Sequence, residues 1–346
     1  MKYLFIITGI AYGHFTREEA IIDKLKKLDK KAEIVIAGYE TSYNYFKGKY
    51  DVLKLNPIVF PDLSSKFKIL NILLKNYNFI AGWINDIAII NDFNREFKAD
   101  VIVSDWEPFA IFTKTGYLIW NYKPKFSKAG NFSLFVQKCA IEFGYFVSRI
   151  LNKKIILPSF KKEKNIKNFI YTDLIIRKKP NEVKELNKYK DSILVMIGGS
   201  RYGVGLAEKI KNVSKGFNEK FIFFGYKCKG KNCIGFDKFN KDYLSFLKSC
   251  KAVISLGGYS GISESVFYRK PNLAFPIKNH LEQHTVTEEF KDYIEIGDID
   301  SPEEEIKIKI ENFLRNLSVL KKKLNSLKLN NGADEIAEII YRKAKS

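Results

Sequence analysis

The chain has 346 residues and is therefore longer than one ordinary α/β domain. Its apolar residues, 46% of the total, are enough for two packed cores. Four cysteines are too few for a disulfide scaffold, and no secretory signal precedes the apolar start at residues 2–7, so we expect a cytoplasmic protein. The net charge of +20 is compatible with nucleic-acid binding, but no recognisable nucleic-acid module accompanies it, so we expect no such partner.

Apolar runs alternate with helical stretches, which is typical of a parallel sheet covered by helices on both faces. In the first half we expect strands at residues 4–8, 33–37, 52–55 and 101–104, and a helix at 17–28. Residues 65–97 are amphipathic with a helical period and are expected to elaborate the first domain.

A turn containing Gly9 and Gly13 follows the first strand and precedes the first helix. Glycines let the backbone approach a ligand, and free N–H groups at a helix start favour negative charge. The turn lacks the third glycine of a dinucleotide fingerprint, and no acidic residue ends the second strand, which disfavours a dehydrogenase. His14 follows at the sheet edge where ligands bind, so it is a candidate catalytic residue, with a structural histidine as the alternative.

Two acidic residues follow the strand at 101–104, namely Asp105 and Glu107. A carboxylate at this position can orient His14 and stabilise its imidazolium form. We therefore take Asp105 as the orienting group, and either carboxylate as the second choice for the catalytic base. The alternative is that Asp105 caps the following helix, and the two roles are compatible.

Basic residues are concentrated in residues 114–167, which hold 12 Lys or Arg against only Glu142 and Glu163. Six aromatic residues lie between Tyr117 and Phe135 in the same stretch. We expect this stretch to dock the protein peripherally on an anionic membrane surface. The alternative is a lysine-rich solvated surface of the kind found in heat-adapted proteins. The apolar residues 131–151 are interrupted by charges, which argues against a membrane-spanning helix.

The second half repeats the alternation and predicts a second Rossmann-like domain. Strands are expected at residues 192–197, 220–224, 252–256 and 273–275, with helices near 204–215, 242–249, 260–268 and 282–291. We place the domains at residues 1–165 and 166–329. Residues 330–346 are expected to form a last helix, which can pack back on the first domain.

Glycine-rich turns follow two strands of the second half. Gly198, Gly199, Ser200 and Arg201 form a turn into a helix, suited to phosphate oxygens, with an ordinary turn as the alternative. Gly257 and Gly258 form the other, where a diphosphate can lie on the start of the helix near Ser260. Glu264, one turn later, is placed to accept hydrogen bonds from ribose hydroxyls, and Glu282 and Gln283 would face the sugar.

The spacing Gly-Gly-x-Ser-x-x-x-Glu from Gly257 to Glu264, followed by Pro271, Pro276 and Glu282-Gln283, resembles the nucleotide-sugar signature of GT-B glycosyltransferases. The nearest resemblance is to the bacterial N-acetylglucosaminyltransferase that completes lipid II. Gly13-His14-Phe15-Thr16-Arg17 also resembles the Gly-His-x-x-Arg motif of an archaeal branch. One departure is that the first loop is poorer in glycine than in the bacterial enzyme. The other is that Arg269 stands where a glycine is usual.

The resemblance implies a GT-B fold, in which two Rossmann-like domains face each other across a cleft. It implies an acceptor-side loop with Gly9, Gly13 and Arg17, and a donor site in the second domain. In that site Gly258, Ser260 and Gly261 would bind the diphosphate, Glu264 the ribose, Gln283 the sugar, and the turn at Phe239 the base. No cofactor or metal is implied, and the pair Cys228 and Cys233 has no second ligand pair nearby.

We therefore predict an inverting glycosyltransferase that moves a sugar from a nucleotide-diphosphate sugar, with UDP the expected nucleotide, to an acceptor hydroxyl. His14 is the predicted base. The basic stretch at 114–167 favours a lipid-linked acceptor. The alternative enzyme is a nucleotide-sugar epimerase of the same fold, which would need no acceptor at the anomeric carbon.

Overall fold

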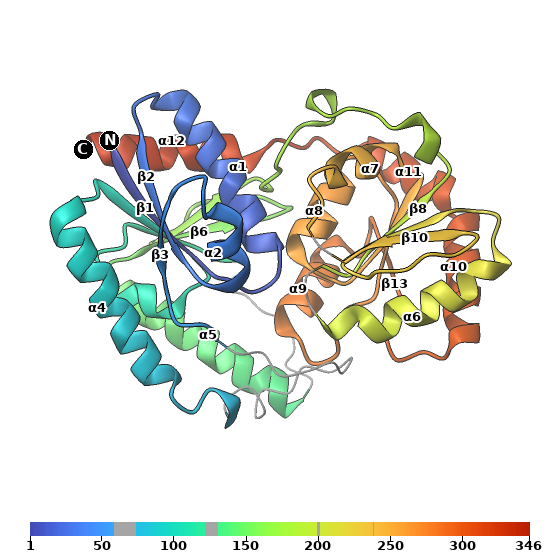
Figure 1. Cartoon of the computed structure of the whole chain (residues 1–346), viewed down its shortest axis with the longest axis horizontal. Helices are drawn as coiled ribbons and strands as arrows, with labels where there is room; N and C mark the ends of the chain where they lie inside the picture. The colour runs from blue at the N-terminus through green and yellow to red at the C-terminus, as the bar shows by residue number, and fades with distance from the viewer. Residues whose placement is uncertain (59–73, 122–130, 199–200, 238) are drawn as a thin grey trace. The chain divides into compact units, whose positions relative to one another are not determined.

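The computed structural model describes residues 1–58, 74–121, 131–198, 201–237 and 239–346. The chain divides into two compact units (Figure 1). Among the described residues, unit 1 comprises 1–58, the part of the chain from 74 to 177, and Asn330–Ser346, and unit 2 comprises Lys178–Leu329.

In the described part of unit 1, a seven-stranded parallel sheet has the order β3-β2-β1-β4-β5-β6-β7. The strands are β1 (Lys2–Ile7), β2 (Glu33–Gly38), β3 (Asp51–Lys54), β4 (Val101–Asp105), β5 (Tyr117–Ile119), β6 (Lys154–Pro158) and β7 (Phe169–Thr172). The central strands β1 and β4 are apolar along nearly their whole length, because helices cover the sheet on both faces.

The helices of unit 1 are α1 (Gly13–Leu28), α2 (Glu40–Phe46), α4 (Phe79–Phe97), the 3-10 helix η1 (Pro108–Phe112), α5 (Phe132–Ile150) and α12 (Gly332–Lys345). Helix α1 buries Phe15, Ile21 and Leu25, which recur at helical spacing on one face. The part of the expected 65–97 helix before residue 74 lies outside the described residues.

The C-terminal helix α12 belongs to unit 1 and packs against α1 (Figure 1). The Asn331 side chain caps its first turn by accepting from the Ala333 N–H at 3.0 Å. Lys24 of α1 lies 2.8 Å from Asp334 of α12. A side chain at Gly332 would lie 1.9 Å from the Asp173 carbonyl, so the returning chain lies tightly against unit 1.

The boundary between the units differs from the one expected at residues 165 and 166. Residues Phe169–Thr172 form β7 and pair with β6 in the first sheet, so unit 1 continues to Arg177. The strand Phe169–Thr172 is short and charged residues flank it, so the pattern of apolar residues did not predict it.

In the described part of unit 2, a six-stranded parallel sheet has the order β10-β9-β8-β11-β12-β13. The strands are β8 (Ile193–Met196), β9 (Phe221–Phe224), β10 (Cys233–Phe236), β11 (Ala252–Ser255), β12 (Asn272–Ala274) and β13 (Glu295–Ile296). The helices are α6 (Val204–Val213), α7 (Tyr243–Ser249), α8 (Tyr259–Phe267), α9 (Leu281–Phe290), α10 (Glu303–Arg315) and α11 (Leu317–Asn325). Short 3-10 turns lie at Pro180–Glu182, Asn187–Tyr189, Arg201–Gly203 and Ser214–Gly216.

Within the ranges that the structure describes, no helix is long and apolar enough to cross a membrane.

Candidate active site

The loop after β1 is held rigidly at the carboxyl edge of the first sheet. β1 and β4 are neighbours, with Ile7 opposite Asp105, and the Thr8 N–H donates to the Asp105 carbonyl at 3.2 Å. A side chain at Gly9 would lie 2.0 Å from the Tyr39 carbonyl, so only glycine fits there. The Thr41 hydroxyl lies 2.7 Å from the Gly9 carbonyl and 2.8 Å from that of Ala11, which fixes the loop.

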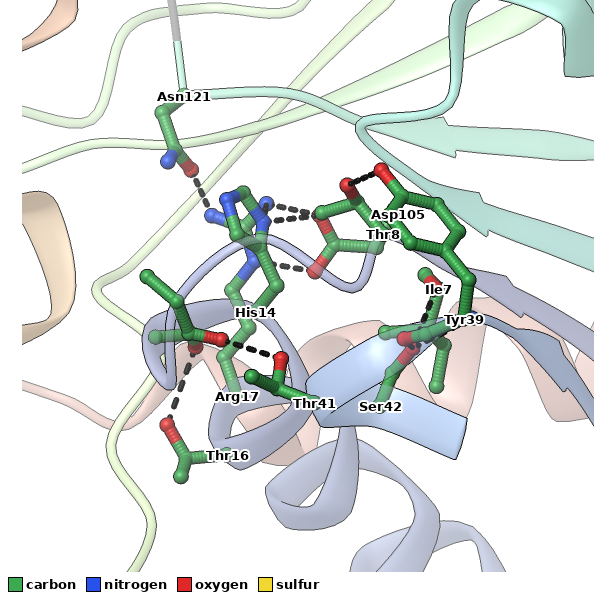
Figure 2. Close-up of polar contacts among 12 residues, drawn as sticks. Ile7, Thr8, His14, Thr16, Arg17, Tyr39, Thr41, Ser42, Asp105 and Asn121 are labelled. Atoms are coloured by element: carbon green, nitrogen blue, oxygen red, sulfur yellow. Dashed lines mark hydrogen bonds and ion pairs between the residues drawn. The ribbon is translucent and has the colours of Figure 1, made fainter. Parts of the chain in front are cut away.

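Helix α1 begins at Gly13, four residues before the start expected at Arg17. This difference matters because it places His14 and Arg17 in the first turn of the helix, three positions apart on one face. Both side chains point toward Asp105 at the end of β4 (Figure 2). Arg17, expected only as part of an acceptor-side loop, is therefore a central member of this site.

A compact polar cluster joins His14, Arg17, Asp105 and Asn121 (Figure 2). His14 Nδ1 lies 2.9 Å from Asp105 Oδ1, and Arg17 Nε donates to Asp105 Oδ2 at 2.5 Å. The other Arg17 nitrogens donate to Asp105 Oδ1 and to the Asn121 side-chain oxygen. Asp105 is thus engaged by His14 and Arg17. Capping of the following helix, the alternative, is not observed, since η1 begins after Glu107 with no side-chain cap.

The charge of Asp105 determines which ring nitrogen of His14 carries the proton. Burial opposes ionisation of Asp105, but the Arg17 guanidinium and His14 outweigh it and bring the pKa of this carboxyl to about 2. His14 Nδ1 lies 2.9 Å from Asp105 Oδ1 and 3.1 Å from Arg17 Nη2. Because an ionised carboxylate only accepts hydrogen bonds, the contact with Asp105 favours the tautomer with a proton on Nδ1 and a basic Nε2. The His14 side chain is 13% exposed while Asp105 is fully buried, so a ligand can approach the imidazole but not the carboxylate.

Glu107 lies on the same edge in a buried environment beside Thr8 and Tyr39, whose hydroxyls are 2.8 Å apart. Burial raises the pKa of Glu107 to about 8, and hydrogen bonds from Thr8 and Tyr39 only partly oppose this. Trp106, between the two acids, has a φ of +57°, a left-handed conformation that is strained for a bulky residue. This backbone turn separates the environments of Asp105 and Glu107.

Comparison of the three candidate bases favours His14. Asp105 is a weak base because its pKa is about 2 and its oxygens are engaged by Arg17 and His14. Glu107 is mostly protonated at neutral pH because its pKa is about 8, so it cannot accept a proton readily.

Sequence patterns did not identify three other participants: Asn121, Thr8 and Glu18. Glu18 of α1 is fully buried and lies close to Asp105. Burial, together with the nearby Asp105, raises the pKa of Glu18 well above its usual range. A neutral Glu18 therefore keeps excess negative charge out of the cluster.

The pKa of Glu107 predicts a measurable pH dependence of stability. Because the folded state retains this proton above the usual pKa of a glutamate, Glu107 favours folding at low pH, and this contribution is lost as pH rises from about 4.5 through about 8. Glu107→Gln should remove a decline of about 1 kcal/mol per pH unit in that window. Urea unfolding of both proteins across this range measures it, and parallel pH profiles would show that Glu107 is ionised in the folded protein.

In unit 2, two glycine turns lie at one edge of the sheet because β8 and β11 are neighbours, with Met196 opposite Ser255. Gly198 has a φ of +65°, and Gly258 is the N-cap of α8. A Cβ at either residue would meet no atom within 4 Å, so both turns leave room for a ligand. At Gly261, by contrast, a Cβ would lie 2.1 Å from Met196 Cε, so a side chain there would displace the end of the flexible Met196 side chain.

The remaining predicted donor residues occupy different environments. Gly199 and Ser200 lie outside the described residues, and Arg201 begins a 3-10 turn. Ser260 and Glu282 lie in the first turns of α8 and α9, and Phe239 precedes α7; all three are half-buried.

Two predicted donor residues are more enclosed than expected for groups that face a ligand. Glu264 is only 4% exposed on α8. Gln283 Oε1 accepts from the Ile277 N–H at 2.8 Å, so it also holds the loop after β12.

The backbone conformation at Arg269 explains why a glycine is usual at this position. Its φ is +57°, in the left-handed region where glycine is favoured, just after the end of α8. The guanidinium donates to the Leu327 carbonyl at 2.7 Å, which helps to hold the arginine in this conformation.

The sequence profile of glycosyl transferase family 1 matches residues 1–119 and 154–318 of this chain. The chain belongs to this family. An uncharacterised glycosyltransferase of Methanosarcina mazei is 23% identical over 325 residues, which covers 82% of this chain and 81% of the relative. The prediction that the protein is a glycosyltransferase is therefore confirmed.

Solved glycosyltransferase structures share the fold of this family 1 member. The glycotransferase of kitacinnamycin has a TM-score of 0.66 at 12% identity, covering 99% of this chain and 98% of that chain. The glycosyltransferase VinC, solved in complex with dTDP, has a TM-score of 0.61 at 12% identity, and both chains are covered completely. The predicted GT-B fold is confirmed, and nothing in these matches favours the epimerase alternative.

Proposed function

We propose that this family 1 glycosyltransferase transfers a sugar, with inversion at the anomeric carbon, from a UDP-linked sugar to an acceptor hydroxyl. The observation that carries this proposal is the pairing of His14 Nδ1 with the buried Asp105 carboxylate at 2.9 Å. This pairing leaves Nε2 as the basic nitrogen of a side chain that is 13% exposed, as a general base requires.

In the proposed reaction, Nε2 of His14 accepts the proton of the acceptor hydroxyl. The hydroxyl oxygen forms its bond to the anomeric carbon while the bond from that carbon to the diphosphate oxygen breaks. Asp105 stabilises the resulting imidazolium, and Arg17 keeps Asp105 ionised. The N-terminus of α8, with help from Arg201, stabilises the departing diphosphate, and no metal takes part in this proposal.

The donor is proposed to bind in unit 2, at the edge that carries Gly198 and Gly258. Two observations support this: the open space at both glycines, and the complex of the structurally similar VinC with dTDP. Glu264 is proposed to bind the ribose, Gln283 and Glu282 the sugar, and the turn at Phe239 the base. UDP is our choice of nucleotide on the sequence resemblance, and dTDP is the competitor to compare with it.

The acceptor is proposed to be lipid-linked and presented at an anionic membrane surface, with the enzyme attached peripherally. The support is the charge of residues 114–167, 12 basic against 2 acidic. Two of the six aromatic residues named for this role cannot contribute, because Tyr117 and Trp120 are buried. Tyr122 and Phe126 lie outside the described residues, whereas Phe132 and Phe135 are exposed.

A thermal-shift screen tests the donor assignment, since a ligand that binds only the folded state stabilises it by about 2.7 kcal/mol at 100 times its Kd. UDP-sugars should raise the Tm more than dTDP-sugars. The stabilising donor is then incubated with polyprenyl-linked sugars that offer a free hydroxyl, and the anomeric configuration of the product is read by NMR. Retained configuration would exclude direct displacement.

Gly258→Val provides a specific test of the diphosphate position. Gly258 has an ordinary extended backbone (φ −72°, ψ 139°) and open space at its Cβ, so valine should fold normally but occupy the proposed diphosphate site. We expect nucleotide-sugar affinity to fall at least about tenfold, a loss of about 1.4 kcal/mol, measured by calorimetry. The matched control is Gly216→Val, an exposed glycine of the same unit whose Cβ would lie 3.7 Å from the Lys307 side chain. Equal affinities for the two variants would move the diphosphate elsewhere.

A further inference from the structure

One face of α5 carries a continuous row of exposed apolar side chains. The row follows helical spacing and consists of Phe132, Phe135, Cys139, Phe143, Phe146 and Ile150. The phenylalanines and the isoleucine are between 54% and 77% exposed, and Cys139 is exposed as well. We call these six residues the α5 stripe. Burying large aromatic side chains is strongly favourable, so such a row on a helix is not explained by folding of the unit.

The opposite face of α5 is the one that packs in unit 1. Tyr145 and Ser148 are buried, and a Cβ at Gly144 would lie 2.8 Å from the Trp120 ring. The Tyr145 ring lies 5.3 Å from that of Trp120, which in turn lies 5.6 Å from that of Trp106. The packed face thus fixes the helix by contacts that reach the active-site edge, and it leaves the α5 stripe pointing outward.

The apolar surface extends beyond α5. Both α4 and α5 contact η1, whose Phe112 is 58% exposed. Ile80 and Ile84 of α4 are also exposed, and α4 carries no charged residue between Phe79 and Asn85. Isolated exposed apolar residues are normal on protein surfaces, but a group on three elements in contact indicates a binding surface.

We propose that the α5 stripe, with Phe112 and the first half of α4, inserts into the headgroup region of an anionic lipid bilayer. Charge supports this occupant: Lys138 and Arg149 lie on α5 beside the stripe with a single acid, Glu142, and the exposed Lys154 follows the helix. Basic groups beside an apolar helical face are the pattern of interfacial helices. A second copy of the chain would bring these like charges together, so self-association is disfavoured.

The position of this surface indicates how a lipid-linked acceptor reaches the active site, an inference that rests on the proposed function. η1 begins at Pro108, directly after Asp105, Trp106 and Glu107, so the same short segment carries active-site groups and part of the apolar surface. A bilayer at the α5 stripe would present the hydroxyl or phosphate end of a lipid carrier close to the edge that bears His14. The lipid part of the acceptor would stay in the membrane during transfer.

Cys139 provides a direct probe, since it lies in the stripe and is exposed, whereas Cys233 and Cys250 are buried. In a Cys228→Ser background, an environment-sensitive fluorophore on Cys139 is mixed with vesicles of phosphatidylcholine and phosphatidylglycerol in equal amounts. We expect a blue shift and quenching by lipids with doxyl groups near the headgroup. An unchanged spectrum, or protection of Cys139 by dimerisation without vesicles, would overturn the proposal.

Substitutions distinguish insertion of the α5 side chains into the bilayer from non-specific attraction of the protein to vesicles. Phe143→Ser, Phe146→Ser and Ile150→Ser together should lower vesicle affinity about 100-fold, because three side chains no longer leave water. The control replaces three exposed apolar residues of unit 2, Ile296, Ile308 and Val319, with serine and should bind like wild type. Equal losses in both variants would contradict a specific surface.

The failure of this inference is distinguishable from failure of the proposed function. Transfer to a short-chain, water-soluble acceptor without vesicles should proceed at the wild-type rate in the triple α5 variant. Loss of that activity would mean that the α5 stripe binds the acceptor itself, which would overturn the membrane assignment. Normal soluble activity in a wild-type protein that does not bind vesicles would overturn only the bilayer proposal.

Discussion

Replacing His14 with alanine should slow sugar transfer by about 10²–10⁴-fold, the usual contribution of a general base. Donor affinity should stay nearly unchanged, because His14 lies in unit 1 and the proposed donor residues lie in unit 2. The stability should also change little, since the imidazole is partly exposed and Asp105 keeps its Arg17 partner. Single-turnover transfer rates, calorimetric donor binding and urea unfolding measure the three quantities.

Lys27→Ala on the exposed side of the same helix is a matched control and should match wild type in all three measurements. A His14→Ala enzyme with the wild-type rate would show that His14 is not the base. A parallel fall in donor affinity would instead place the imidazole against the donor.

Much of the fold could be predicted because its central strands are long and apolar. The first strand, expected at residues 4–8, is β1 at Lys2–Ile7, and the strand expected at 101–104 is β4 at Val101–Asp105. In unit 1 the strands β5, β6 and β7 were missed because each has only three to five residues and basic segments lie around them. The short strands β10 and β13 of unit 2 were missed as well. Short strands at the side of a sheet become recognisable only through the strand beside them.

The site was predictable in part for a similar reason. His14 and Asp105 follow adjacent strands, and the rule that ligands bind at carboxyl edges identified both. Asn121 and Glu18 were not identifiable, because their importance depends on tertiary contacts with Arg17 and Asp105. The contrast between Asp105, with a pKa of about 2, and Glu107, with a pKa of about 8, likewise arises from burial and from Arg17, and not from any local pattern.

Asp105→Asn should have the largest combined effect. The amide removes the charge that balances the buried Arg17 guanidinium, and an uncompensated buried charge typically costs about 3–5 kcal/mol in the free energy of unfolding. The amide also no longer requires a proton on His14 Nδ1, so the tautomer with a basic Nε2 loses its preference. In a triad with this arrangement the corresponding change lowers the rate by about 10⁴-fold, and we expect a loss of that order.

The same substitution tests the role of Glu18. Burial and the charge of Asp105 raise the pKa of Glu18, whereas Arg17 lowers it. Removing the charge of Asp105 should therefore favour ionisation of Glu18, which would partly balance Arg17. The double variant Asp105→Asn/Glu18→Gln should therefore lose more stability than the sum of the two single variants, because neither carboxylate remains to pair with Arg17. His14→Ala/Glu18→Gln is the control and should be close to additive, since Asp105 stays ionised in it. Urea unfolding at neutral pH gives the four free energies of each cycle. Additive losses in the Asp105 cycle would show that Glu18 stays neutral there, and that Asn121 and the backbone around Arg17 absorb the change instead.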